Sequence, residues 1–177
     1  MKSFGICVCI IALSTFAGCG SQSDVTVDAG AADPVVQSQR ERLVLATEPP
    51  DSKTPTEAKE LAAEPTDLVL AGRIDAGEID PFKPGMASFM ISQLPEEGHG
   101  ADDPDHAENC KFCARRLANA PKVIVEFKDD DGETLAIDSQ QLFGVQKGDV
   151  VLVRGKVRYQ EATNTVHVDG DGLYRQQ

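Results

Sequence analysis

The chain has 177 residues, and its 29 acidic residues outnumber its 17 basic ones to give a formal net charge of −12. A chain this acidic gains little from contact with a phosphate backbone, so general nucleic-acid binding is disfavoured. Its length fits one small domain with extensions.

The N-terminus has the pattern of an export signal. Residues 4–16 form an apolar run after Lys2, and the small residues Ala17 and Gly18 precede Cys19. The run is too short to cross a bilayer, which takes about 20 apolar residues. A basic start, a short apolar run and a small-residue cleavage site are typical of a secretory signal. We therefore expect residues 1–18 to be removed, either directly before Cys19 or nearby with Cys19 incidental.

The ending Phe-Ala-Gly-Cys resembles the lipobox of bacterial lipoproteins, although Phe16 stands where that family prefers Leu. The resemblance implies that Cys19 carries a diacylglycerol and becomes the first residue of a protein anchored to a membrane. Gly20 occupies the next position, where lipoproteins retained on the inner membrane often have Asp. We therefore expect a lipid-anchored protein of the cell envelope, with the outer membrane favoured and the domain facing the periplasm or the surface.

Residues 19–65 are rich in small, acidic and proline residues, with Pro49, Pro50, Pro55 and Pro65 as breakers. Such a segment buries too little apolar surface to offset the entropy of ordering it. We expect a disordered linker here, with one short helix around residues 36–45.

Alternating apolar residues predict a mainly β domain over residues 66–177. We expect strands at 68–74, 86–92, 122–127, 150–159 and 164–168, with 134–137 returning from a hairpin turn and one helical turn at 139–143 capped by Ser139. This order, together with the run from Gly148 to Val157, resembles the OB-fold, a five-stranded Greek-key barrel. Another small barrel or a sandwich fits the same spacing.

An insertion at 94–121 separates the second and third expected strands, and it contains His99, His106, Cys110 and Cys113. Asp103 and Pro104 have the pattern of a helix start, which predicts a helix from Pro104 to about Ala118. Spacings of four and three residues place His106, Cys110, Cys113 and also Leu117 on one stripe of that helix. Imidazole and thiolate ligands suit Zn²⁺ or Cu⁺, with His99 as a fourth ligand and Asp102, Asp103 or Asp105 as substitutes.

Two other interpretations of the same residues stay open. Cys110 and Cys113 can form a disulfide, structural or redox-active, in an exported protein, and the domain is then an interaction module for a glycan or protein partner. Alternatively, the stripe is simply the buried face of a helix, since cysteine behaves as a small hydrophobe. No nucleophile–base motif appears in the sequence, so we do not expect an enzyme.

The segments Asp80–Phe89 and Asn109–Cys113 resemble those of an uncharacterised type of exported bacterial protein, in which a His- and acid-rich loop ends in Asn-Cys-x-Phe-Cys. The resemblance implies that the loop belongs to the type, and it implies no activity. Elsewhere, we expect Arg154, Lys156, Arg158 and His167 on the solvated exterior, and a turn rather than a Ca²⁺ site at Asp129–Asp131.

Overall fold

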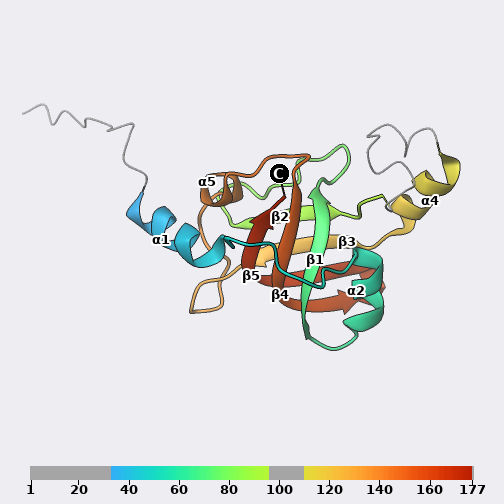
Figure 1. Ribbon diagram of the computed structural model, residues 1–177, viewed down its shortest axis with the longest axis horizontal. Coiled ribbons are helices and arrows are strands. Elements are labelled where there is room, and N and C mark those ends of the chain that lie inside the picture. Colours follow the sequence, from blue (N-terminus) through green and yellow to red (C-terminus); the bar gives the residue numbers. More distant parts are fainter. Residues whose placement is uncertain (1–32, 96–109, 177) are drawn as a thin grey trace, which may run out of the picture. The chain divides into compact units, whose positions relative to one another are not determined.

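A computed structural model describes residues 33–95 and 110–176 (Figure 1). It contains five strands: β1 (Thr66–Ile74), β2 (Ser88–Ser92), β3 (Lys122–Phe127), β4 (Val150–Gln160) and β5 (Thr165–Arg175). The helices are α1 (Pro34–Leu43), α2 (Pro55–Leu61), α4 (Lys111–Asn119) and α5 (Ser139–Phe143), with a 3-10 turn, η1 (Glu161–Thr163), between the last two strands. The predicted mainly β class is confirmed, and so is a helix between strands 2 and 3.

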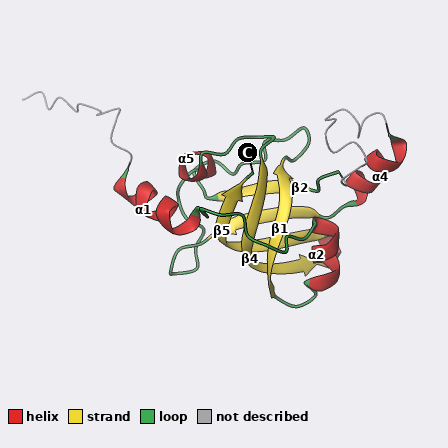
Figure 2. Cartoon of the chain, viewed as in Figure 1, coloured by secondary structure: helices red, strands yellow, loops and turns green. Residues whose placement is uncertain are grey.

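The five strands close into a ring in the order β1-β2-β3-β5-β4, with β1 also hydrogen-bonded to β4. All neighbours are antiparallel except β3 and β5, which run parallel. Figure 2 shows the strands crossing as they wrap around the interior, with the helices outside the sheet. The chain therefore forms the small, OB-like closed sheet of five strands that the strand order predicted.

The side chains of β4 alternate between the barrel interior and the solvent. Val151, Val153 and Val157 are fully buried, whereas the basic residues between Val153 and Tyr159 are exposed. At Gly155 the register with β5 shifts, and a Cβ there would collide with the carbonyl oxygen of Asp169. Glycine is thus required where the two strands approach most closely.

Helix α5 closes one end of the barrel with apolar side chains. Leu142 is fully buried, and the ring of Phe143 lies 4.5 Å from the ring of Phe127 between centroids. The Ser139 hydroxyl donates to the carbonyl of Met86 at 3.1 Å instead of capping the helix, whose N-cap is Asp138. The predicted helical turn is therefore present, but its predicted cap is wrong, because Ser139 is buried inside the first turn.

The domain starts earlier than the sequence suggested. Residues Val36 and Leu43 of α1 and Ala58 of α2 belong to the same buried apolar cluster as the barrel. The segment between these helices adds backbone pairing, because Lys53 N donates to Val69 O at 2.7 Å and Ala71 N donates to Lys53 O at 3.0 Å. Residues 33–65 are therefore part of the folded domain and not a linker, and residues 19–32 of the predicted linker lie outside the described residues.

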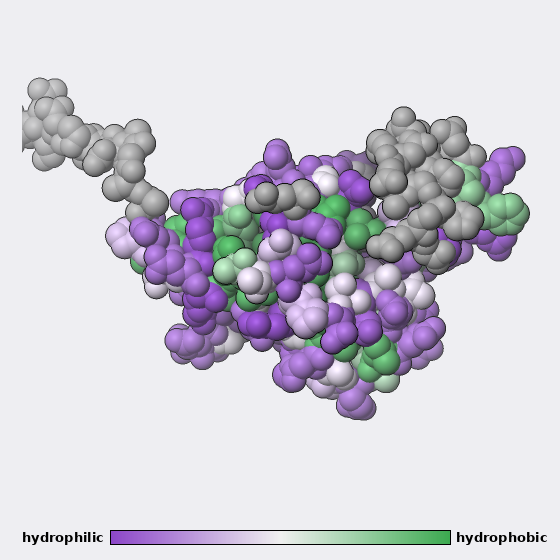
Figure 3. Space-filling view, in the orientation of Figure 1, coloured by the Kyte–Doolittle hydropathy of each residue, from purple (hydrophilic) through white to green (hydrophobic). Residues whose placement is uncertain are grey.

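Two local predictions differ from the structure for identifiable reasons. Residues 134–137 form only one bridge, from Thr134 to Lys128, because the chain leaves the sheet after the tight turn at Gly132. Strand β5 runs to Arg175, well past the predicted end at residue 168, because its pairing with β4 continues after the register shift beside Gly155. Hydrophilic residues cover most of the face in Figure 3, and none of the helices in residues 33–95 and 110–176 combines the length and apolarity needed to cross a bilayer.

Candidate functional site

The two cysteines of the insertion meet at the start of α4. Cys110 is the N-cap of this helix and has an extended backbone, with φ −104° and ψ 102°. Cys113 lies in the first turn, and its backbone N–H donates to Cys110 Sγ at 3.5 Å. The sulfur of Cys110 therefore occupies the place that a serine or aspartate oxygen takes at an ordinary helix N-cap.

This cap overturns the predicted helix from Pro104 to Ala118. Because Cys110 is extended, the helix begins at Lys111, and Cys110 and Cys113 do not stand on a continuous helical stripe. The structure nevertheless brings the two cysteines together, through capping rather than through helical periodicity. His99, His106 and the aspartates of the predicted ligand set lie outside the described residues.

The two cysteines differ in exposure. Cys113 is 7% exposed and Cys110 is half-buried, and they are not joined to each other in a disulfide. Phe112, between them, is 87% exposed, which is the largest exposed fraction among the large apolar side chains of the described residues. Cys110 is thus the more accessible of the two cysteines, and an exposed apolar ring follows it in the chain.

The environment of Cys110 favours its thiolate. The backbone N–H of Cys113 lowers the pKa of Cys110 most, and contributions from the Cys113 side chain, the Phe112 backbone and the positive charge of Arg116 act in the same direction. A thiolate is both the nucleophilic form and the metal-ligating form of cysteine. The first turn of α4 therefore prepares Cys110 for either chemistry.

A surface cavity of about 270 Å³ adjoins the pair and is lined by Cys110, Phe112, Cys113 and Arg116. Two thiolates can hold a soft ion, but a tetrahedral site needs further ligands. Across residues 33–95 and 110–176 no group of three or more acidic, histidine or cysteine side chains is close enough to form a complete set.

Sequence reasoning missed Phe112 and Arg116 as neighbours of the sulfurs. The available signal was their spacing: Phe112 directly precedes Cys113, and Arg116 follows it by one helical turn, which places it on the same side of the helix.

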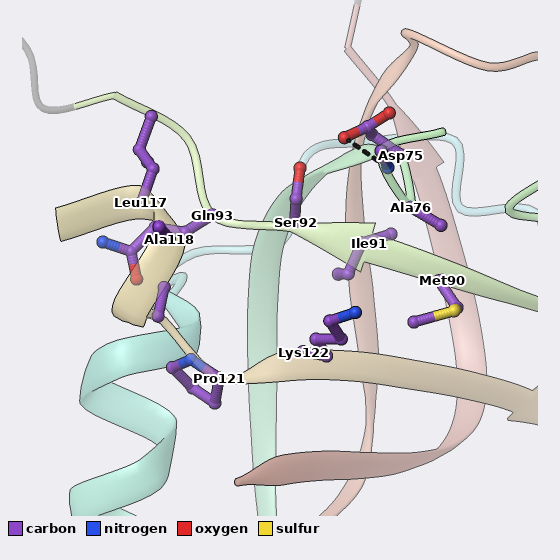
Figure 4. Close-up of a pocket in the computed structure, with 12 residues that line it drawn as sticks. Asp75, Ala76, Met90, Ile91, Ser92, Gln93, Leu117, Ala118, Pro121 and Lys122 are labelled. Atoms are coloured by element: carbon purple, nitrogen blue, oxygen red, sulfur yellow. Dashed lines mark hydrogen bonds between the residues drawn. The ribbon is translucent and has the colours of Figure 1, made fainter. Parts of the chain in front are cut away.

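A second hollow, of about 210 Å³, lies beneath the other end of α4 (Figure 4). Leu117, Ala118 and Pro121 line one side of it, and Met90 and Ile91 of β2 line the other. Within the part of the chain that the structure describes, its lining includes neither cysteine nor histidine. This hollow thus lies between the C-terminal end of α4 and β2, away from the two cysteines.

The remaining candidates behave as surface features. Arg154 and Lys156 are exposed and pair with Asp171 at 2.6 Å and Asp67 at 3.0 Å, respectively. The exposed Arg158 shares their face of β4, while half-buried His167 lies 3.2 Å from the side-chain oxygen of Gln160. The Asp129 carboxylate accepts the backbone N–H groups of Asp131 and Glu133, each at 3.0 Å. The predicted turn at Asp129–Asp131 is confirmed.

Comparisons with known proteins add little. No protein-family model and no curated protein matches the chain. Among solved structures, the chain is similar to one described as an aspartyl-tRNA synthetase from Leishmania major Friedlin, with a TM-score of 0.42 and 9% identity. The match covers 80% of this chain and 25% of that one, so the chain spans about a quarter of the protein it resembles. A similarity this weak says nothing about what the chain does.

Proposed function

We propose that the chain is a lipid-anchored protein of the bacterial cell envelope whose barrel carries a thiolate site for Zn²⁺ or Cu⁺. Cys19 is the proposed point of lipid attachment, on the strength of the signal-like residues before it. Cys110 and Cys113 are the proposed sulfur ligands, with His106 and His99 completing the set.

The observation that carries the proposal is the hydrogen bond of 3.5 Å from Cys113 N to Cys110 Sγ. It holds one sulfur over the first turn of α4, where the second sulfur also originates. N–H donors directed at a ligating sulfur orient the ligand and stabilise its negative charge. The cavity beside the pair leaves room for an ion and its remaining ligands.

The lowered pKa of Cys110 predicts how metal affinity depends on pH. Metal ions bind thiolates and compete with protons for them, so affinity should rise with pH until both cysteines are deprotonated. Because the pKa of Cys110 is lowered, metal affinity should stop rising at a lower pH than it would for cysteines in an unfolded chain. Such a site could buffer, sense or deliver a soft metal ion in the envelope.

The proposal is tested by metal content. The full chain, produced in a bacterial host and extracted in detergent, is reduced, exposed to Zn²⁺ or Cu⁺, freed of excess metal and measured by native mass spectrometry. We expect one ion per chain, strong loss of binding in Cys110→Ser and Cys113→Ser, and weakening in His106→Gln.

His167→Gln is the matched control, because His167 lies on β5 beside Gln160 rather than near α4. The control should retain full metal content. Absence of stoichiometric metal, or unchanged binding in the double cysteine variant, would contradict the proposal.

A further inference from the structure

We infer that Cys110 and Cys113 also form a redox pair that exchanges its disulfide with the cysteine thiols of exported polypeptides. The export of the partners rests on the proposed location in the cell envelope, whereas the exchange itself involves only the two described sulfurs and their surroundings and is independent of metal binding. Its four supports are the ease of ring closure, the unequal exposure of the sulfurs, a hydrogen bond to the outer sulfur and an apolar side chain beside it.

The N-cap geometry at the start of α4 brings the Cys110 sulfur over the residue that carries the second sulfur. Disulfides span Cβ separations of about 3.5–4.5 Å. Residues three apart inside a regular helix are neighbours, but their Cβ atoms lie about 5–6 Å apart, which is wider than a disulfide takes. Because Cys110 is the N-cap, its side chain instead folds over the first turn, with Sγ 3.5 Å from Cys113 N. This N-cap arrangement therefore favours closure of a Cys110–Cys113 disulfide.

The unequal exposure determines which sulfur a partner reaches. Both cysteines border the cavity, but Cys110 is half-buried whereas Cys113 is 7% exposed. A partner sulfur must approach nearly in line with the bond that it breaks, and Cys110 is the more accessible of the two. The N–H of Cys113 also points at Cys110 Sγ, where it stabilises negative charge when that sulfur leaves.

The exchange proceeds in two balanced steps from the closed disulfide. A partner thiolate attacks Cys110 Sγ, so a bond between the partner and Cys110 forms while the Cys110–Cys113 bond breaks, and Cys113 leaves as a thiolate that takes a proton from water. A second partner thiolate then attacks the first partner sulfur, and Cys110 leaves as a thiolate. The partner dithiol is oxidised to a disulfide, and Cys110 and Cys113 are reduced by the same two electrons.

Phe112 indicates that the partner is a polypeptide rather than a small thiol. Its ring is 87% exposed and lines the same cavity as Cys110. An apolar ring beside a reactive sulfur binds side chains that flank a partner cysteine, and small thiols such as glutathione lack such side chains. The ring should therefore speed exchange with a peptide and leave small thiols unaffected.

The test uses the full chain, extracted in detergent and kept with a chelator so that metal binding plays no part. The protein is equilibrated with mixtures of reduced and oxidised glutathione, quenched with acid, alkylated and analysed by mass spectrometry. We expect one reversible transition between dithiol and Cys110–Cys113 disulfide. In Cys113→Ser, glutathione should remain attached to Cys110, and this adduct should form roughly tenfold faster than the adduct at Cys113 in Cys110→Ser, because access controls exchange. Serine is a good N-cap, so Cys110→Ser should keep α4 folded.

A second arm compares a two-cysteine peptide with dithiothreitol as the thiol that the oxidised protein converts. Phe112→Ser should slow oxidation of the peptide and leave oxidation of dithiothreitol unchanged. The redox inference is overturned if no Cys110–Cys113 bond forms at any glutathione ratio, or if both cysteines form adducts at the same rate. Equal slowing of both thiols by Phe112→Ser would overturn the assignment of a polypeptide partner.

Discussion

The side chain of Leu45 lies directly over Gly172 of β5 and would have to shift to admit a side chain at that position. A Cβ on residue 172 would stand 2.9 Å from Leu45 Cδ2, and Leu45 N donates to the neighbouring Leu173 O at 2.8 Å. The segment that joins α1 to α2 is thus attached to the barrel both by backbone hydrogen bonding and by close packing.

Substitution of Gly172 should therefore destabilise the domain. We expect Gly172→Val to lower the free energy of unfolding by about 1–3 kcal/mol, because overpacking forces the segment away from β5. Urea unfolding measures the change. The Leu45→Ala background removes the obstructing side chain, so Gly172→Val should cost less there. An equal cost in both backgrounds would show that Leu45 is not the obstruction.

Truncation of an α1 side chain tests whether residues before 66 belong to the folded domain. Leu43 is 3% exposed, so Leu43→Ala should cost about 2–5 kcal/mol, as burial of a large side chain in a packed core implies. Val35, on the same helix, is 60% exposed, and Val35→Ala should change the unfolding midpoint little. Similar midpoints for both variants would show that α1 is not part of the folded domain.

The first turn of α2 contributes a pH-dependent stability through Glu57. Thr54 lowers the pKa of Glu57, through its backbone N–H and then through its hydroxyl, and the Thr54 hydroxyl in turn accepts from Glu57 N at 3.2 Å. Since the folded pKa is the lower one, this stabilisation is present above the ordinary glutamate pKa and is lost as the pH falls through the lowered value.

Two substitutions separate the contribution of the Thr54 cap to stability from that of the Glu57 charge. Thr54→Ala should cost about 0.5–2 kcal/mol at neutral pH, because it removes a helix N-cap. Glu57→Gln keeps a capping side chain and should flatten the dependence of the urea midpoint on pH in the acid range, while Glu60→Gln on the same helix serves as control. An unchanged pH profile in Glu57→Gln would show that the capping carboxylate contributes nothing measurable.

Alternation of apolar residues located all five strands, although β5 is much longer than the predicted 164–168. The run from Lys122 to Phe127 forms β3 with the predicted bounds, since Val123, Val125 and Phe127 all face the core. The role of residues 33–65 was not predictable in this way. Lys53 pairs with β1 through its backbone N–H and C=O groups. Nearly every residue type carries these groups, so the sequence does not show where such pairing occurs.

The candidate site was predicted in part. The spacing of Cys110 and Cys113 identified the pair, but the expected helix began too early, because Asp103 and Pro104 have a stronger start pattern than a cysteine does. A thiol as N-cap is not anticipated by the usual preference for serine, threonine, aspartate and asparagine. The exposure of Phe112 depends on how α4 projects from the sheet, which sequence periodicity does not determine.

Removal of the proposed lipid attachment point should release the protein from membranes. We expect the natural chain to enter the detergent phase in a phase-separation experiment, and Cys19→Ala to move to the aqueous phase, because two or more acyl chains are needed for stable anchoring. Cys110→Ser should partition like the natural chain. Recovery of the natural chain in the aqueous phase would argue against a lipid anchor.

X-ray absorption at the zinc edge of the loaded full chain tests the central claim most directly, because it counts the sulfur atoms around the ion. The account predicts two sulfur neighbours at about 2.3 Å, the usual Zn–S distance, with one lost in Cys110→Ser and one in Cys113→Ser. A shell of nitrogen and oxygen alone, or a spectrum unchanged by both substitutions, would contradict it.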